Sequence, residues 1–154
     1  MIIDNIKIFY NSLIINRPLI AIDHGLSKLG FAISDPQLNI AMPLQKFNGR
    51  DMDAQILTTM NIINRHNPCG IVIGWPMMMD GTVSQQSSSV QKFAEQLALK
   101  TSWPIYMQDE RLTTKAADSL LRSMGWNRKE RTQCDDSVAA SLILETVLAN
   151  IKTC

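Results

Sequence analysis

Apolar residues follow two different periods along the chain, and each period predicts one kind of element. Short apolar runs bounded by turn residues are typical of buried strands. They lie at residues 19–23, 31–34, 40–47, 71–73 and 104–107. Apolar residues spaced three or four positions apart predict helices instead. These helices are expected over residues 51–65, 84–100, 113–124 and 134–151.

The order of these elements predicts a mixed α/β sheet. A turn at residues 24–30, bracketed by Gly25 and Gly30, joins the first two strands into an antiparallel hairpin. Pro43 gives the third strand an edge position, because proline cannot donate to a neighbouring strand. The later strands alternate with helices, which is typical of parallel strands joined by crossovers. We therefore expect one domain over residues 18–154, with three antiparallel strands, then parallel ones, flanked by helices.

Residues 1–17 are apolar enough to resemble a signal peptide. Charged residues interrupt them, however, and no small-residue cleavage site follows. Apolar residues recur at helical spacing from Ile2 to Leu13. We predict an N-terminal amphipathic helix that docks on the domain.

Composition and charge exclude several classes of protein. The chain has 154 residues, 45% hydrophobic and 19% charged, unlike disordered or collagen-like chains. Its net charge of +1 gives no general sign of a nucleic-acid partner, so such a partner must be argued from local features. Three widely separated cysteines argue against a disulfide framework, and no apolar run is long enough to span a membrane. We expect a cytoplasmic protein without a membrane partner.

Acidic residues end two predicted strands and begin the last helix. They are Asp23, Asp109 with Glu110, and Asp135 with Asp136. Functional groups gather at the carboxyl ends of parallel strands, so these carboxylates can meet. Crowded carboxylates repel one another unless a cation intervenes, and oxygen ligands favour Mg²⁺ or Mn²⁺. Two such ions support phosphodiester cleavage. Taken singly, acids at these places also serve as helix caps or in surface ion pairs.

Basic residues lie near these acids. Lys28, in the glycine-bracketed turn, is a candidate phosphate ligand. Residues 122–131 carry four basic residues against one acid, a local charge of +3, and Arg128, Lys129 and Arg131 are three of the four. Such a segment can hold a nucleic-acid backbone without reading bases. An ordinary solvated loop has the same composition.

Several blocks of sequence together resemble the YqgF-type family of Holliday junction resolvases, also regarded as precursor 16S rRNA nucleases. They follow one another in family order over residues 19–148. The blocks are AIDHG with LGFAIS, IVIGWP with MDGT, DERLTT, and DSVAA with IL. The DERLTT block is the most specific, whereas the first hairpin is shared more widely and also resembles the phosphate loop of two-domain, actin-like kinases.

The resemblance implies a ribonuclease H-like fold with a five-stranded mixed sheet, and a divalent-metal nuclease that acts on structured nucleic acid. Asp23, Glu110 and Asp136 match the family's catalytic and metal-binding carboxylates, and Asp109 is the second choice for the middle ligand. Arg111 lies beside the expected site as a candidate phosphate ligand.

The resemblance also implies a substrate and leaves alternatives open. Processing of the 5′ end of pre-16S rRNA is favoured, with the ribosome as a candidate partner. Cleavage of branched DNA is the first alternative, and a non-catalytic RNA-binding module is another. Both a monomer and a homodimer remain open. The chain departs from the family pattern at His24 and Trp75, and it lacks the lysines that usually lie close to the acid matched by Asp136.

Overall fold

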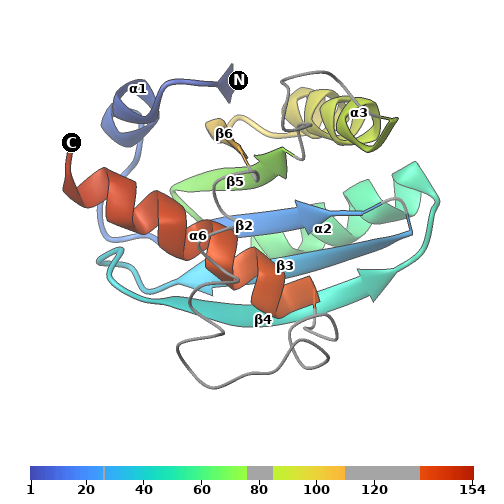
Figure 1. Cartoon of the computed structure of the whole chain (residues 1–154), viewed down its shortest axis with the longest axis horizontal. Helices are drawn as coiled ribbons and strands as arrows, with labels where there is room; N and C mark the ends of the chain where they lie inside the picture. The colour runs from blue at the N-terminus through green and yellow to red at the C-terminus, as the bar shows by residue number, and fades with distance from the viewer. Residues whose placement is uncertain (26, 76–84, 110–135) are drawn as a thin grey trace.

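Six strands form one sheet in the order β1-β6-β5-β2-β3-β4 (Figure 1). The computed structural model of the chain describes residues 1–25, 27–75, 85–109 and 136–154. The strands are β1 (Ile2–Ile3), β2 (Leu19–His24), β3 (Lys28–Ser34), β4 (Ala41–Asn48), β5 (Gly70–Trp75) and β6 (Ile105–Asp109). Strands β2, β3 and β4 pair antiparallel, whereas β5 runs parallel to β2 and β6 parallel to β5. The predicted mixed sheet is confirmed, with one strand more than the five expected.

The extra strand comes from the N-terminal segment, which differs from the single helix predicted for residues 1–17. Ile2 and Ile3 pair in parallel with β6, and the helix α1 covers only Ile6–Asn11. The side chain of Asn5 starts this helix by accepting hydrogen bonds from two backbone N–H groups of its first turn. Phe9 is fully buried and stacks on Tyr106 of β6, with 5.3 Å between ring centroids. The segment therefore docks on the domain, as a strand followed by a short helix.

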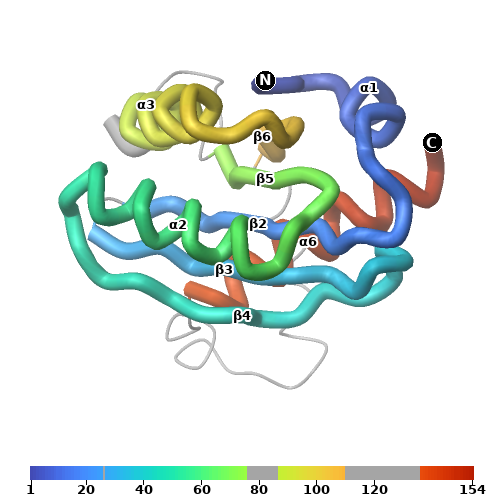
Figure 2. Tube along the Cα trace, turned by 180° about the vertical axis from the view of Figure 1, so that it is seen from behind, coloured from blue at the N-terminus to red at the C-terminus, as the bar shows by residue number. Residues whose placement is uncertain are grey.

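Helices cover both faces of the sheet. The long helices are α2 (Met52–His66), α3 (Gln85–Lys100) and α6 (Asp136–Lys152). Figure 1 shows α6 in front of the sheet, and Figure 2, from behind, shows α2 in front of it with α3 above. Each face has its own apolar core, one against α2 and α3 and the other against α6 and α1. None of the helices described here is long and apolar enough to cross a membrane.

The remaining sequence predictions agree with these bounds to within a few residues, with one correction at the first hairpin. The turn predicted over residues 24–30 is shorter, because β2 continues to His24 and β3 already begins at Lys28. Cys69 is buried and Cys154 exposed, and both are free thiols. The helix predicted over residues 113–124 lies outside the described residues.

Candidate active site

Side-chain alternation along β2 places Asp23 on the face that α6 covers. Leu19 and Ala21, four and two positions before Asp23, pack in the core against α6. Ile20 and Ile22 point the other way, into the core against α2 and α3. Since successive side chains of a strand alternate between faces, half-buried Asp23 follows Leu19 and Ala21 onto the α6 side.

Gly30 brings the start of α6 onto this same place. It is the partner of Asp23 across the β2–β3 ladder, and residues opposite each other lie roughly 5 Å apart. A Cβ atom on Gly30 would meet the carbonyl group of Asp136 and, at 2.8 Å, the amide nitrogen of Ser137. The first turn of α6 therefore rests directly on the Gly30 backbone, which brings Asp136 beside Asp23. Gly30 is a close-approach position inside a strand and not a turn residue.

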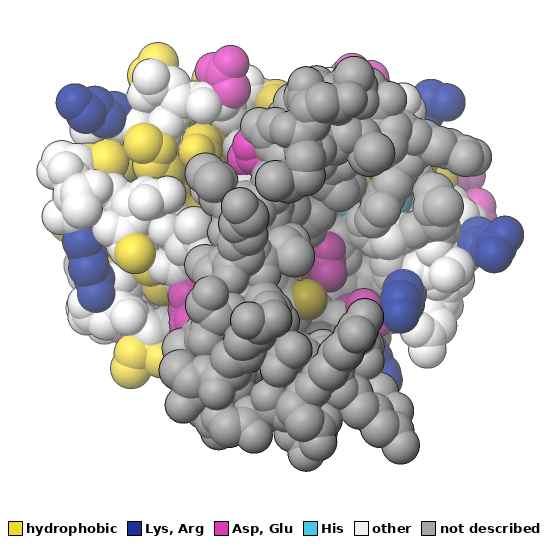
Figure 3. Space-filling model, in the orientation of Figure 1, with side chains coloured by type: hydrophobic (Ala, Val, Ile, Leu, Met, Phe, Trp, Pro, Cys, Tyr) yellow, Lys and Arg dark blue, Asp and Glu magenta, His cyan; other side chains and the backbone are white. Residues whose placement is uncertain are grey.

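Lys28 adds a positive charge to the two acids. Its Nζ lies 3.7 Å from Oδ1 of Asp136, and 57% of the Lys28 side chain is exposed against 23% of Asp136. Figure 3 shows acidic side chains next to a basic one on this face, where α6 begins. Sequence reasoning expects Lys28 to contact a phosphate, and here it contacts one of the candidate metal ligands. An exposed lysine can exchange one anionic partner for the other.

A buried hydrogen-bond network holds the hairpin that carries these residues. Nε2 of His24 and Oε1 of Gln55 lie 2.9 Å apart, and Nε2 of Gln55 donates to the Gly49 carbonyl. The Gly49 amide in turn donates to the carbonyl of Ser27, in the hairpin turn. Burial lowers the pKa of His24 below its ordinary value of 6.5, so the ring is neutral at pH 7. Gln55 was not predicted from the sequence. The one feature that could have indicated its role is that it is a polar residue on the apolar side of its helix.

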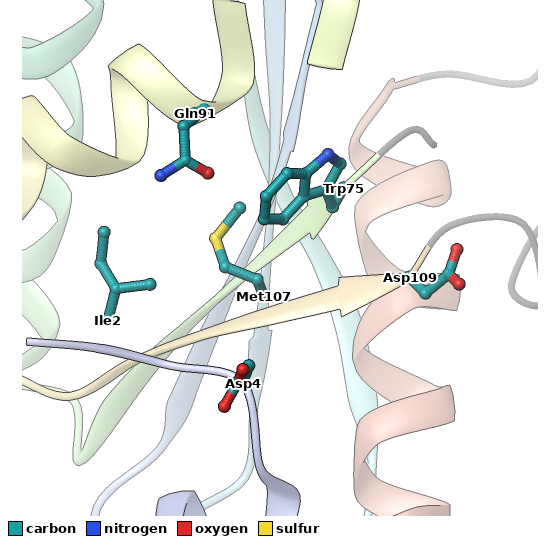
Figure 4. Close-up of a pocket in the computed structure, with 6 residues that line it drawn as sticks. All are labelled: Ile2, Asp4, Trp75, Gln91, Met107 and Asp109. Atoms are coloured by element: carbon teal, nitrogen blue, oxygen red, sulfur yellow. The ribbon is translucent and has the colours of Figure 1, made fainter. Parts of the chain in front are cut away.

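Of the expected site residues, Asp23, Lys28 and Asp136 are brought together, and Asp109 lies elsewhere. Asp109 ends β6 and lines a pocket on the α3 side with Met107 and Trp75 (Figure 4). The others lie outside the described residues: Glu110, Arg111, Arg128, Lys129, Asp135 and Arg131. Within the described ranges, no group of three or more His, Cys, Asp or Glu side chains is placed to hold a metal ion.

The donor chemistry of this site nevertheless suits a hard divalent cation. Asp23 and Asp136 offer only carboxylate oxygens, the ligands that Mg²⁺ and Mn²⁺ prefer. The ammonium group of Lys28 already stands next to Asp136 as a cation of lower charge. Asp23 and Asp136 thus offer the oxygen donors that the site expected from the sequence requires, and Glu110, its expected third ligand, lies outside the described residues.

Comparison with known proteins gives one family match and full-length relatives. The family model described as "RuvX: Holliday junction resolvase" matches residues 17–150. A protein of Rickettsia africae is 53% identical over 152 residues, covering 99% of both chains, and a protein of Rickettsia rickettsii matches equally well. Both carry the name "Putative pre-16S rRNA nuclease".

Solved structures share the fold at low sequence identity. RuvC of Thermus thermophilus, solved with a Holliday junction substrate, matches with a TM-score of 0.58 and 13% identity, over 89% of this chain and 97% of RuvC. The yeast mitochondrial Holliday junction resolvase matches with a TM-score of 0.54 and 13% identity, over 96% of this chain and 86% of the resolvase. These matches bear out the ribonuclease H-like fold that the sequence blocks imply.

Proposed function

Because the chain belongs to the RuvX family of Holliday junction resolvases, we propose that it is a nuclease that hydrolyses phosphodiester bonds in the precursor of 16S rRNA. The observation that carries the proposal is the contact of α6 with Gly30. That contact sets Asp136 on the same face and at the same sheet end as Asp23. Two carboxylates held by a strand and a helix terminus form a rigid site for a cation and for the phosphate that the cation attracts.

In this proposal Asp23, Asp136 and Glu110 hold divalent cations, Mg²⁺ or Mn²⁺. Two such cations supply Lewis-acid stabilisation of the attacking and leaving oxygens during phosphodiester cleavage. Asp23 and Asp136 keep their carboxylates ionised and oriented. Lys28 leaves Asp136 and takes up a phosphate oxygen of the substrate strand. Arg111, Arg128, Lys129 and Arg131 complete the grip on the backbone.

The relatives favour RNA as the substrate. Two relatives that are 53% identical over 152 residues carry the name "Putative pre-16S rRNA nuclease". The resolvase structures are only 13% identical in sequence, so they support the fold alone. Resolution of a Holliday junction is the second candidate, because the family description names it. The cytoplasm, where precursor rRNA is found, is the compartment that this function requires.

The test offers both substrates to the same preparations. Wild-type protein, Asp23→Asn and Asp136→Asn are incubated with Mg²⁺ and either a precursor 16S rRNA fragment or a four-way DNA junction, and the cleavage sites are mapped. We expect site-specific cleavage of the RNA by the wild type and loss of cleavage in both variants. Asp53→Asn, an exposed acid in the first turn of α2, is the matched control and should cleave normally.

Three other outcomes contradict parts of the proposal. If the protein cleaves only the four-way DNA junction, its substrate is branched DNA and not precursor rRNA. Equal activity of wild type and Asp23→Asn removes the role given to Asp23. If the protein binds RNA tightly but cleaves it under no condition, it is an RNA-binding module and not a nuclease.

A further inference from the structure

Gln55 is the centre of a chain of hydrogen bonds that connects α2 to the turn between β2 and β3. Only 1% of Gln55 is exposed, and only 2% of its partner His24. Because Nε2 of Gln55 donates to the Gly49 carbonyl at 2.8 Å, its oxygen is left to accept from Nε2 of His24. Buried polar groups are costly to leave unpaired, so the two bonds together fix the Gln55 amide in one orientation.

The same chain of bonds ends at the residue before Lys28. The Gly49 amide donates to the Ser27 carbonyl at 2.8 Å. Asn48, directly before Gly49, is the ladder partner of Lys28. The Gly25 amide closes the turn on the Lys28 carbonyl, also at 2.8 Å. The Lys28 backbone is therefore held by β4 and, through Gly49, by the buried amide of α2.

The position of the backbone matters at Lys28 because nothing else fixes the reach of its exposed side chain. Its Nζ lies 3.7 Å from Oδ1 of Asp136, and 57% of the side chain is exposed. The attraction between an ammonium group and an anion falls with their distance. A lysine on a mobile backbone also loses more conformational entropy when it binds a phosphate, so it binds that phosphate more weakly.

The chain of bonds acts on the turn from the face opposite the carboxylates. His24 follows Asp23 in β2 and points toward α2 and α3, where it packs on Phe93 with 4.6 Å between ring centroids. Figure 2 shows α2, which carries Gln55, on this side of the sheet. The Gln55 side chain therefore reaches Lys28 only through the hairpin backbone. His24 also departs from the family pattern, so the family match does not imply this bond.

We propose that Gln55 is a positioning residue, which holds the turn between β2 and β3 so that Lys28 reaches a phosphate of the bound RNA strand. This inference rests on the proposed nuclease function, because it concerns how the same site holds its substrate. With the Gln55 amide in place, Lys28 exchanges Asp136 for the phosphate while its backbone stays fixed. Without that amide, the Gly49 carbonyl loses its donor from α2, the turn moves more freely, and Lys28 binds the phosphate less tightly.

The test measures the salt dependence of RNA binding, separately from cleavage. A labelled fragment of precursor 16S rRNA is titrated at several salt concentrations with proteins that carry Asp23→Asn to prevent cleavage. Each phosphate contact contributes about 0.7–0.9 to the slope of log affinity against log salt. We expect Lys28→Met to lower the slope by about this amount, and Gln55→Met, which removes both hydrogen bonds, to lower it by at least about half as much. A loss of stability alone does not change the slope of a protein that circular dichroism shows to be folded.

A double variant separates positioning from general damage to the fold. If Gln55 acts through Lys28, adding Gln55→Met to Lys28→Met should change neither the slope nor the affinity by more than about twofold. Ser34→Ala is the matched control, at the far end of the same hairpin. Ser34 is 3% exposed, and its hydroxyl also makes two hydrogen bonds, from the Leu19 amide and to the Asp35 carbonyl. This control should keep the wild-type slope.

Three results would overturn the positioning role. They are an unchanged slope in Lys28→Met, an unchanged slope in Gln55→Met, and an equal effect of Gln55→Met with and without Lys28. If Gln55→Met does not fold, His24→Phe takes its place. It keeps a ring beside Phe93 but removes the donor to Gln55, so it should lower the slope in the same direction, and an unchanged slope again overturns the role.

The same measurements keep this inference apart from the proposed function. Loss of the positioning role leaves the nuclease intact if the wild type still cleaves precursor rRNA. Conversely, coupling between Gln55 and Lys28 in RNA binding, without cleavage of any RNA, removes the nuclease and keeps the positioning role.

Discussion

Replacing Gly30 by alanine tests the central geometric claim about the site. The new methyl group points at backbone atoms of the first turn of α6, which cannot rotate away as a side chain would. The amide nitrogen of Ser137 would lie 2.8 Å from the Cβ atom, against an ordinary contact of 3.4 Å or more, so it must retreat by at least 3.4 − 2.8 = 0.6 Å. The carbonyl group of Asp136 lies closer and must move further.

The size of the effect follows from where α6 is anchored. Ala140, Leu144 and Val147 are fully buried further along the helix, so the first turn is displaced while the rest of α6 stays in place. Overpacking of this kind costs about 1–3 kcal/mol, or about 2–4 °C in Tm per kcal/mol for a chain of this size. A displacement near 1 Å at a catalytic group reduces activity about 100-fold. We therefore expect Gly30→Ala to stay folded and to lose most of its cleavage rate.

The assay is denaturant unfolding together with Mg²⁺-dependent cleavage of precursor rRNA, at a temperature where both proteins are folded. Gly25→Ala, in the same hairpin, is the matched control. Its Cβ atom would lie 3.1 Å from the Lys28 carbonyl oxygen and 3.5 Å from Lys28 Cγ, which requires only a small adjustment. Wild-type kcat and stability in Gly30→Ala would refute the close approach of α6 to the sheet.

Three further predictions concern residues around the site and the N-terminal segment. Lys28→Met removes the charge beside Asp136, so Mn²⁺ should bind more tightly in calorimetry while cleavage slows; weaker Mn²⁺ binding contradicts this. Phe9→Ala should lose about 3–5 kcal/mol in denaturant unfolding, and a loss below about 1 kcal/mol means that the segment is not docked. Because burial lowers the pKa of His24 below 6.5, the unfolded chain takes up a proton at a higher pH than the folded chain does. Wild-type stability should therefore fall from about pH 7.5 to about pH 5.5 more than that of His24→Phe, and parallel pH profiles of unfolding would exclude the effect.

The sheet was predictable from sequence because its strands carry strong local signals. The apolar runs that contain Ile22 and Ile73 are buried on both faces, so nothing but a central strand suits them. Strand β1 was not predictable, since two residues carry no periodicity. Ile2 and Ile3 form a strand only because β6 offers an unpaired edge beside them.

The roles given to Asp23, Glu110 and Asp136 stay predictions, and the geometry around them was harder to foresee from the sequence than the residue types. Asp23 was singled out as a candidate because an acid directly after an apolar strand is unusual. The role of Gly30 was not, because a glycine near a turn has the same sequence signal whether it bends the chain or admits a neighbouring backbone. The position of Asp109 depends on its face of β6. It lies two residues after Met107, which packs toward α3, and so it lines the pocket on that side.

Two features lie on opposite faces of the sheet, at the end where β2, β5 and β6 finish. The carboxylates of Asp23 and Asp136 lie on the α6 face, and the pocket lined by Trp75 and Asp109 lies on the α3 face. The pocket wall at Asp4 depends on the N-terminal segment, which is anchored through Phe9 and Tyr106 and does not contact Gly30 through any bond described here. Substitutions in the pocket should therefore leave the carboxylates in place, and substitutions at Gly30 should leave the pocket in place. A double variant that combines Gly30→Ala with Trp75→Leu should therefore lose as much stability in denaturant unfolding as the two single variants together, and a loss that is not additive would show that the two faces are coupled.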